Sequence, residues 1–184
     1  MQPKSKDRDP TLLAAVAIVA LASIVFVGID VAGYYNSFNA PTLALLNQQG
    51  EAQLPNTTYN GTTIQLLIQL TQRHSTNQRF ALMVYVSNAT GFLNEKNGPI
   101  GNETAVIQLP QQPNLSLPLR LQVWYTNKDG ALDAYLLKIN GDNYPLSIPI
   151  THGLVGIFFQ LVEAKNGSYV ATNTWTNIWL NVKQ

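Results

Sequence analysis

The sequence contains no cysteine, and it is poor in charge for a chain of 184 residues. Without cysteine, a disulfide, a thiolate metal site, a cysteine nucleophile and a copper site of the cupredoxin kind are all excluded. Charged residues make up 11% of the chain, against about 25% in ordinary globular domains, and Asn, Gln, Thr and Ser take their place. A net charge of +1 with scattered Lys and Arg offers no basic surface for nucleic acid.

Motifs of the common enzyme classes are also missing. The sequence has no G-x-S-x-G elbow, no P-loop and no G-x-G-x-x-G. A zinc site needs three or four ligands, whereas His74 and His152 are far apart in the sequence and neither has a carboxylate beside it. Asp129 and Asp133 are interpreted as residues of a hairpin turn rather than as a carboxylate pair. We therefore expect a non-catalytic protein without a metal or other cofactor.

The shortage of acidic side chains bears on where the protein is expected to work. Stability is lost in acid mainly where ionised carboxylates were needed in the native state. We therefore expect the fold to tolerate an acidic exterior, although a surface rich in amides also fits an ordinary glycosylated protein. The absence of cysteine, beside the glycosylation signals described below, favours an archaeal cell envelope.

One long apolar segment begins at Thr11 and ends at Ile29, and it contains no charge, proline or amide side chain. At about 1.5 Å per residue a helix of this length spans about 28 Å, which is close to the hydrocarbon thickness of a bilayer. Such a helix also satisfies its own backbone hydrogen bonds. We predict a polar tail at residues 1–10 and a membrane-spanning helix at residues 11–35, surrounded by lipid or by hydrophobic helices of other subunits.

Flanking residues predict how this helix is oriented. Three basic residues precede the apolar segment, and no Lys or Arg follows it until Arg73. Tyr34 and Tyr35 stand where an aromatic belt would lie at the outer interface. The N-terminus is therefore expected in the cytoplasm and the C-terminal domain outside the cell. The competing interpretation is a cleaved secretory signal, which has a shorter apolar core and an Ala-x-Ala type of site.

From Thr62 onward the apolar period changes to two, as in strands with one buried face. Apolar side chains alternate at Ile64, Leu66, Ile68 and Leu70. Further runs are found at residues 79–87, 104–109, 118–126, 132–139, 144–150, 154–163, 168–172 and 174–182. Turn signals such as Asp129-Gly130, Asn140-Gly141 and Asn166-Gly167 separate several of them. The pattern predicts a connector at residues 36–61 and an antiparallel β-sandwich of immunoglobulin-like type at residues 62–184.

The most specific surface signal is a set of N-x-S/T acceptor sites in which x is never proline. An acceptor must be exposed on a translocated segment, and all of them lie after the apolar segment. A chain rich in Asn and Thr also produces some of these sites by chance. The six candidate acceptors are Asn56, Asn60, Asn88, Asn102, Asn114 and Asn166.

The three tryptophans are the remaining candidates for a binding surface. Trp175 and Trp179 are four residues apart in a predicted strand and therefore share one face, whereas Trp124 belongs to another strand. They are expected either to stack on a sugar or quinone head group or, as is more common for such residues, to fill a core or an interface.

In plan the chain resembles an archaeal type IV pilin, which has a short charged leader, a hydrophobic helix and a β-rich glycosylated head. The residues before the apolar segment are Asp7-Arg8-Asp9-Pro10, where the pilin leader peptidase site has a Lys/Arg-Gly/Ala pair. A virion or surface-layer component fits the same plan. The resemblance implies a structural or assembly protein of the cell envelope that meets copies of itself or another envelope protein.

The alternative belongs to a different class of protein. The chain is also similar in architecture to the small, non-catalytic subunit of a thiosulfate:quinone or quinol oxidase complex, which has one span and a cofactor-free outer β domain. Extraction with a mild detergent discriminates between the two hypotheses. If the chain is an oxidase subunit, it is expected to co-purify with a multi-span partner. If it is an envelope protein, it is expected in sheared filaments or particles.

Overall fold

The computed structural model describes residues 40–72, 78–88 and 102–183. From Pro41 onward they belong to one compact unit. Regular structure in the described residues is almost entirely β-strand, arranged in two sheets, which confirms the prediction of a mainly β chain.

The predicted membrane helix lies outside the described residues. This holds for the ends of its apolar segment, Thr11 and Ile29, and for the two expected interface residues, Tyr34 and Tyr35. Among the residues that are described, no helix is both long enough and apolar enough to cross a bilayer.

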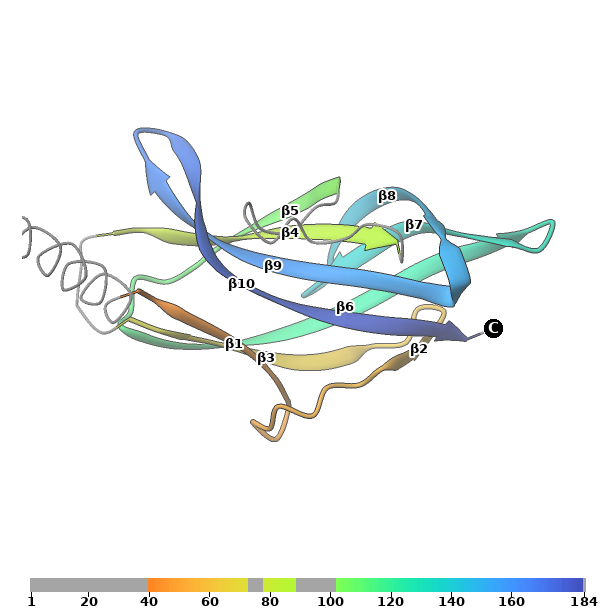
Figure 1. Ribbon diagram of the computed structural model, residues 1–184, viewed down its shortest axis with the longest axis horizontal. Helices are drawn as coiled ribbons and strands as arrows, with labels where there is room; N and C mark the ends of the chain where they lie inside the picture. The colour runs from red at the N-terminus through yellow and green to blue at the C-terminus, as the bar shows by residue number, and fades with distance from the viewer. Residues whose placement is uncertain (1–39, 73–77, 89–101, 184) are drawn as a thin grey trace, which may run out of the picture. The chain divides into compact units, whose positions relative to one another are not determined.

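Within the described residues, ten strands form two five-stranded sheets (Figure 1). The order in one sheet is β1-β3-β6-β7-β8, and in the other it is β2-β10-β9-β4-β5. A short 3₁₀ helix, η1 (Thr151–Gly153), connects β8 to β9. The strands are β1 (Thr42–Asn47), β2 (Thr57–Tyr59), β3 (Ile64–Thr71), β4 (Phe80–Asn88), β5 (Asn102–Gln108), β6 (Asn114–Lys128), β7 (Ala131–Ile139), β8 (Asp142–Ile150), β9 (Leu154–Lys165) and β10 (Ser168–Lys183).

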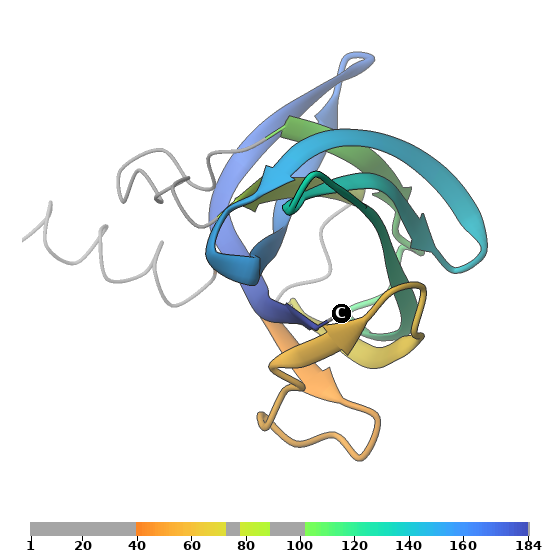
Figure 2. The same ribbon diagram turned by 90° about the vertical axis from the view of Figure 1, so that its right-hand side faces the viewer.

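The apolar pattern of the sequence explains how the two sheets pack. Strand β3 alternates strictly, with Ile64, Leu66, Ile68 and Leu70 buried and the residues between them exposed or half-buried. Strand β9 is buried along most of its length and lies inside its sheet between β10 and β4, which fits its nearly continuous run of apolar residues. Figure 2 shows both sheets curving around a shared interior. Inward-facing side chains of both sheets form one hydrophobic core.

Three hairpins close at the predicted turns. Each turn has two successive residues with positive φ, which fits the type I′ geometry of two-residue hairpins. The pairs are Asp129 (φ 54°) with Gly130 (φ 84°), Asn140 (φ 55°) with Gly141 (φ 102°), and Asn166 (φ 50°) with Gly167 (φ 81°).

The segment predicted as a connector, residues 36–61, contains two strands of the sandwich, β1 and β2. Strand β1 pairs antiparallel with β3 over six residues. Strand β2 pairs parallel with the end of β10, from Asn181↔Thr57 to Lys183↔Tyr59. Strand β1 coincides with the apolar run at residues 41–46, which the sequence alone leaves open between a short helix and a first strand, whereas β2 has only three residues and no periodic signal. The parallel β2–β10 pair is also an exception to the predicted antiparallel pairing, and it places the last strand inside the sheet order rather than at an edge.

Candidate functional site

The outer face of the β2-β10-β9-β4-β5 sheet carries an aromatic layer. Phe158 of β9 alternates with core residues and therefore points away from the interior, yet it is fully buried. Its ring centroid lies 5.5 Å from that of Trp179 at an interplanar angle of 90°, and 6.5 Å from that of Trp175 at 55°. The prediction that the two tryptophans share one face is confirmed, and both indole rings lie beside the same phenylalanine ring.

A glycine makes room for this layer. Gly156 pairs across the strands with Trp179. A Cβ atom added to Gly156 would lie 2.8 Å from Trp179 Cζ3 and 2.9 Å from Phe158 Cε2, well inside an ordinary carbon–carbon contact of about 3.5–4.0 Å. The indole therefore lies directly over the backbone of the central strand.

A polar network continues the same face. The Tyr85 hydroxyl donates to Gln160 Oε1 at 3.2 Å and lies 2.7 Å from Met83 Sδ, while Gln160 Nε2 donates to the Thr172 carbonyl oxygen at 3.1 Å. Burial raises the pKa of Tyr85 above its ordinary value, and the nearby carboxylate of Glu103 adds to the rise. The hydroxyl therefore stays protonated at neutral pH and remains a donor.

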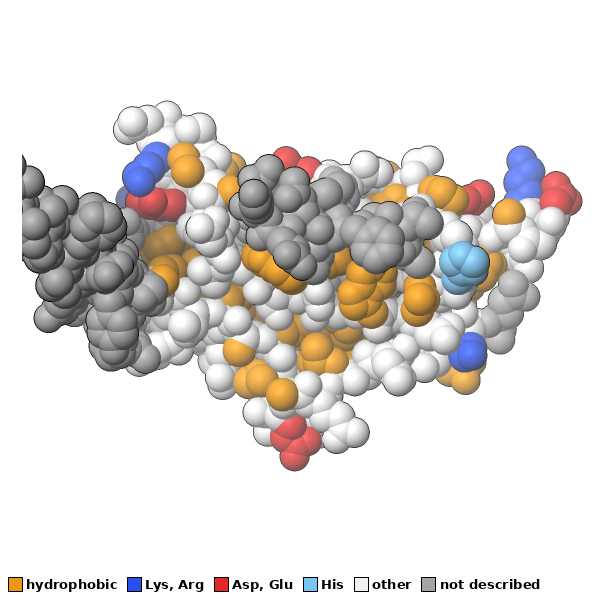
Figure 3. Space-filling view, viewed as in Figure 1, with side chains coloured by type: hydrophobic (Ala, Val, Ile, Leu, Met, Phe, Trp, Pro, Cys, Tyr) orange, Lys and Arg blue, Asp and Glu red, His pale blue; other side chains and the backbone are white. Residues whose placement is uncertain are grey.

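Charge is scarce over this side of the molecule. Figure 3 shows hydrophobic patches over β9 and β10 within a surface of mostly uncharged polar groups, with charged side chains toward the periphery. The strength of contacts made through such a surface should depend little on ionic strength, because it has few charges for salt to screen.

Trp124 does not join the other two tryptophans, because it lies on β6 in the opposite sheet. Its ring lies against Gly61, where an added Cβ would come within 2.7 Å of Cζ2, and Lys138 Nζ lies 5.6 Å from the ring centroid. Its Nε1 is buried without a hydrogen-bond partner among the described residues. The three tryptophans therefore do not form a single platform.

The structure describes all six candidate acceptor asparagines, and most of them are accessible. Asn88, at the end of β4, is half-buried. The exposed acceptors are Asn56, Asn60, Asn102, Asn114 and Asn166. All six stand at turns or strand ends rather than in strand centres.

Asn60 lies in a recess that we call the Tyr59 recess. Its volume is about 410 Å³, and its lining residues are Tyr59, Asn60, Tyr125, Asn127, Leu132 and Lys183. The Tyr125 hydroxyl donates to the Lys183 carbonyl oxygen. Burial raises the pKa of Tyr125, and a hydrogen bond with the Asn60 backbone offsets part of that rise.

A smaller recess holds two other acceptors. Asn88 and Asn102 lie together because Val86, two residues before Asn88, pairs with Asn102 across β4 and β5. They line a recess of about 180 Å³ with Ser147 and Pro149 of the neighbouring strand β8. Sugars on both asparagines would compete for the same space at this seam between the sheets.

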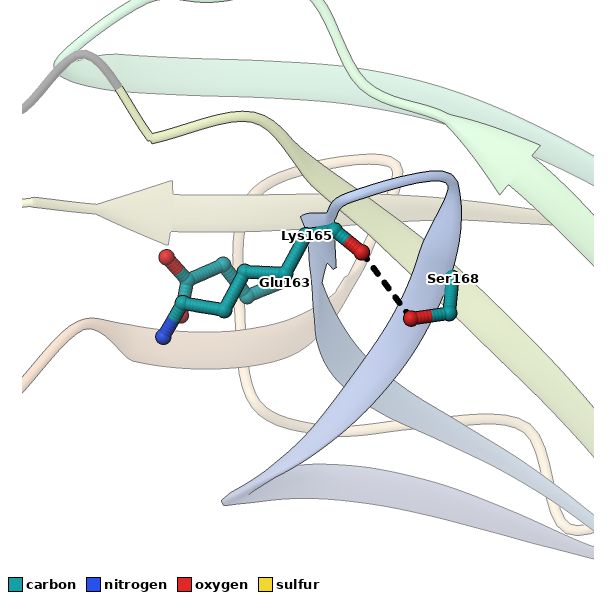
Figure 4. A network of polar contacts seen from close by, with 3 residues as sticks. All are labelled: Glu163, Lys165 and Ser168. Carbon is teal, nitrogen blue, oxygen red and sulfur yellow. Dashed lines mark hydrogen bonds and ion pairs between the residues drawn. The ribbon is translucent and has the colours of Figure 1, made fainter.

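Asn166 stands instead at the exposed tip of the β9–β10 hairpin. Lys165 and Glu163 form an ion pair at 2.8 Å before the turn, and Ser168 Oγ donates to the Lys165 carbonyl oxygen at 2.9 Å after it (Figure 4). A Cβ added to Gly167 would meet nothing within 4 Å. A sugar at Asn166 therefore meets little protein surface at the turn itself.

The two histidines are not brought into a metal site by the described residues. His152 lies in η1 with a positive φ of 55°, and His74 lies outside the described residues. No group of three or more His, Cys, Asp or Glu that could hold a metal ion occurs in the described part of the chain.

The sequence predicted Asn60 as an acceptor but not the recess around it. Tyr59, directly before Asn60, was the only local signal, since an exposed aromatic beside an acceptor can contact the attached sugar. Lys183 and Asn127 are more than 60 residues away in the sequence, and only the β2–β10 pairing and the β6–β7 hairpin bring them close.

No protein-family model matches the chain, and no curated protein matches it. The function is therefore inferred from the geometry of the described residues.

Proposed function

We propose that this protein is a non-catalytic structural or assembly component of a cell envelope, filament or particle. Its apolar segment anchors it in a membrane or in a bundle of hydrophobic helices, with the N-terminus in the cytoplasm. The β-sandwich, immunoglobulin-like in its two-sheet architecture, is displayed outside the cell and carries N-linked sugars. Copies of the chain, or another envelope protein, are its expected partners.

The observation that carries this proposal is the placement of the acceptors. Five of the six candidate asparagines are exposed, and all stand at turns or strand ends of a sandwich with its own core. Asparagines scattered by chance would also fall within strands, where the ladder and the packing obstruct a bulky sugar. Placement at the ends lets several glycans coat the domain without disturbing either sheet.

The low charge of the chain supports association between copies. A net charge of +1 over 184 residues produces little long-range repulsion, so copies can pack closely at any ionic strength. A coat of neutral sugars would then supply the solubility that charged side chains supply in other proteins.

The test is the intact mass of the native protein extracted from membranes with a mild detergent. We expect a mass above that of the 20.2 kDa chain by whole sugar units, and we expect protease added to intact cells to degrade the sandwich. An unmodified mass, or a sandwich that stays protected in intact cells, would refute the proposal.

Sizing of the same extract discriminates the envelope protein from the oxidoreductase subunit. An envelope protein is expected in assemblies of its own copies, or in sheared filaments or particles. Stoichiometric co-migration with a multi-span protein and quinone-linked activity would instead favour the accessory subunit.

A further inference from the structure

The Tyr59 recess is built where three separate parts of the sandwich meet. Strand β2 contributes Tyr59, the β6–β7 hairpin contributes Asn127 and Leu132, and the last residue of β10 contributes Lys183. The parallel β2–β10 pair fixes this meeting point, since Tyr59 pairs directly with Lys183. A volume of about 410 Å³ falls within the range of about 300–1,000 Å³ that is typical of small-molecule sites.

The side chain of Asn60 is held in one orientation within this recess. Its Oδ1 accepts a hydrogen bond from the Tyr125 backbone N–H at 3.0 Å. The residue stands at a reverse turn in which Thr62 N–H donates to the Tyr59 carbonyl oxygen at 3.0 Å, and Gly61 takes the positive φ of 67° that such a turn requires. The amide Nδ2 makes no hydrogen bond to a described residue, and it remains available.

This bonding pattern suits an asparagine that carries a sugar. In N-glycosylation, Nδ2 forms a bond to C1 of a sugar on a polyprenyl-phosphate carrier, the phosphate leaves with the electrons of the broken C–O bond, and the amide loses one proton to the transferase. The reaction leaves Oδ1 unchanged, so its hydrogen bond to Tyr125 persists. The third residue of the acceptor site, Thr62, is exposed, and it is therefore accessible to a transferase.

The lining of the recess has the chemistry of a sugar-binding surface. The Tyr59 side chain is 58% exposed, and an aromatic ring offers an apolar face for the C–H groups of a sugar. The Asn127 amide and the Lys183 ammonium supply hydrogen-bond donors for hydroxyl groups. Exposure of a tyrosine beside an acceptor is explained if the attached sugar covers it.

We propose that the first sugar of an N-linked glycan on Asn60 packs against Tyr59 in this recess and stabilises the fold. The inference rests on the proposed glycoprotein character of the chain. It distinguishes Asn60 from Asn56, whose Thr58 is 1% exposed in the folded chain, and from Asn166, which stands at an open hairpin tip. Among the acceptors, the glycan on Asn60 is then a packed part of the structure.

The experiment compares full-length variants that are produced in a host with N-glycosylation and extracted in mild detergent. The occupancy of each acceptor site is measured from peptide masses, and Tm is measured by circular dichroism. Thr62→Ala removes the acceptor site while leaving Asn60 and its bond to Tyr125 in place. We expect it to lower Tm by about 2–5 °C, the effect of one aromatic contact in a domain of this size. Ser168→Ala, which removes the acceptor site at Asn166, is the matched control. It also removes the hydrogen bond from Ser168 Oγ to the Lys165 carbonyl oxygen, so any change in Tm should be the same with and without glycosylation.

A Tyr59→Ala background tests the contact itself. In this background, Thr62→Ala should no longer change Tm, whereas it should retain its effect with Tyr59→Phe. The same variants made in a host without N-glycosylation should show no effect of Thr62→Ala.

The outcomes separate the two proposals. An equal loss of Tm with and without the Tyr59 ring, or the same loss without glycosylation, would overturn the packing of the sugar. An unmodified Asn60 beside other modified acceptors would overturn this inference and leave the glycoprotein proposal standing. Absence of sugar at every acceptor would overturn both.

Discussion

Replacing Gly156 with alanine tests whether the aromatic layer on the outer face is as closely packed as the structure shows. The new Cβ would lie 2.8 Å and 2.9 Å from two atoms of Trp179 and 2.9 Å from Phe158 Cε2. Ordinary carbon contacts are about 3.5–4.0 Å, so the two rings must move by roughly half an ångström or more. The glycine does not have a positive φ, and backbone strain therefore does not contribute.

The expected cost follows from two opposing effects. Overpacking of a filled site costs about 1–3 kcal/mol, whereas a Gly→Ala change at a permissive backbone position gains about 0.4–1 kcal/mol by restricting the unfolded chain. Trp179 is half-buried, so its indole can swing outward and relieve the clash at the expense of its edge-to-face contact with Phe158. We expect a net loss of about 1–2 kcal/mol, or a decrease in Tm of about 2–8 °C.

The assay is equilibrium urea unfolding of the full chain in mild detergent, followed by far-UV circular dichroism. Trp179→Ala provides the matched background, because it removes the ring that approaches closest to the added Cβ. In that background Gly156→Ala should cost nearly nothing or become favourable. An equal cost in both backgrounds, or a stabilising effect in the wild-type chain, would refute the close packing of the indole on the glycine.

Two predictions concern pH. Because the pKa of Tyr85 is raised in the folded state, the native chain keeps this proton to higher pH than the unfolded chain, and the free energy of unfolding should fall as pH rises above about 10. Tyr85→Phe should make this fall shallower in urea unfolding at pH 9–11, and equal slopes would count against the raised pKa. In acid, the Glu163–Lys165 pair, whose lysine is exposed and whose glutamate is half-buried, is the one ion pair among the described residues, and pairs near the surface contribute about 0–1 kcal/mol. Unfolding free energy should therefore fall by only about 1 kcal/mol between pH 7 and 3, and a collapse between pH 5 and 2 would contradict this.

Strand positions could be predicted well where the apolar period was unambiguous. The alternation from Ile64 to Leu70 gave β3 nearly to the residue, and the Asp-Gly and Asn-Gly pairs located three hairpins because few other dipeptides accept two positive φ angles. The prediction started β6 at Pro118, whereas the strand begins at Asn114 and includes that proline, which pairs with Leu67. Strand β10 was predicted as two strands, since a bulge between Ala171 and Trp175 interrupts its register.

The candidate site was harder to predict, because its parts come from distant segments. Local periodicity shows that Trp175 and Trp179 share a face, but it cannot show that Phe158 lies beneath both rings. The Tyr59 recess depends on a three-residue parallel pairing between β2 and β10, and a strand that short carries no periodic signal. Acceptor motifs are purely local, and they were therefore identified without knowledge of the fold.

The way β1 enters the sandwich has a mechanical consequence. Strand β1 pairs with β3 in unbroken register from Thr42↔Thr71 to Asn47↔Leu66, and antiparallel hydrogen bonds run perpendicular to the strands. Tension applied at residue 41 along the strand therefore loads the whole ladder in shear rather than peeling it one bond at a time. Thr174 Oγ1 also donates to the Pro41 carbonyl oxygen at 3.1 Å, so the same pull is passed to the opposite sheet, and the sandwich can bear force at the point where the chain enters it.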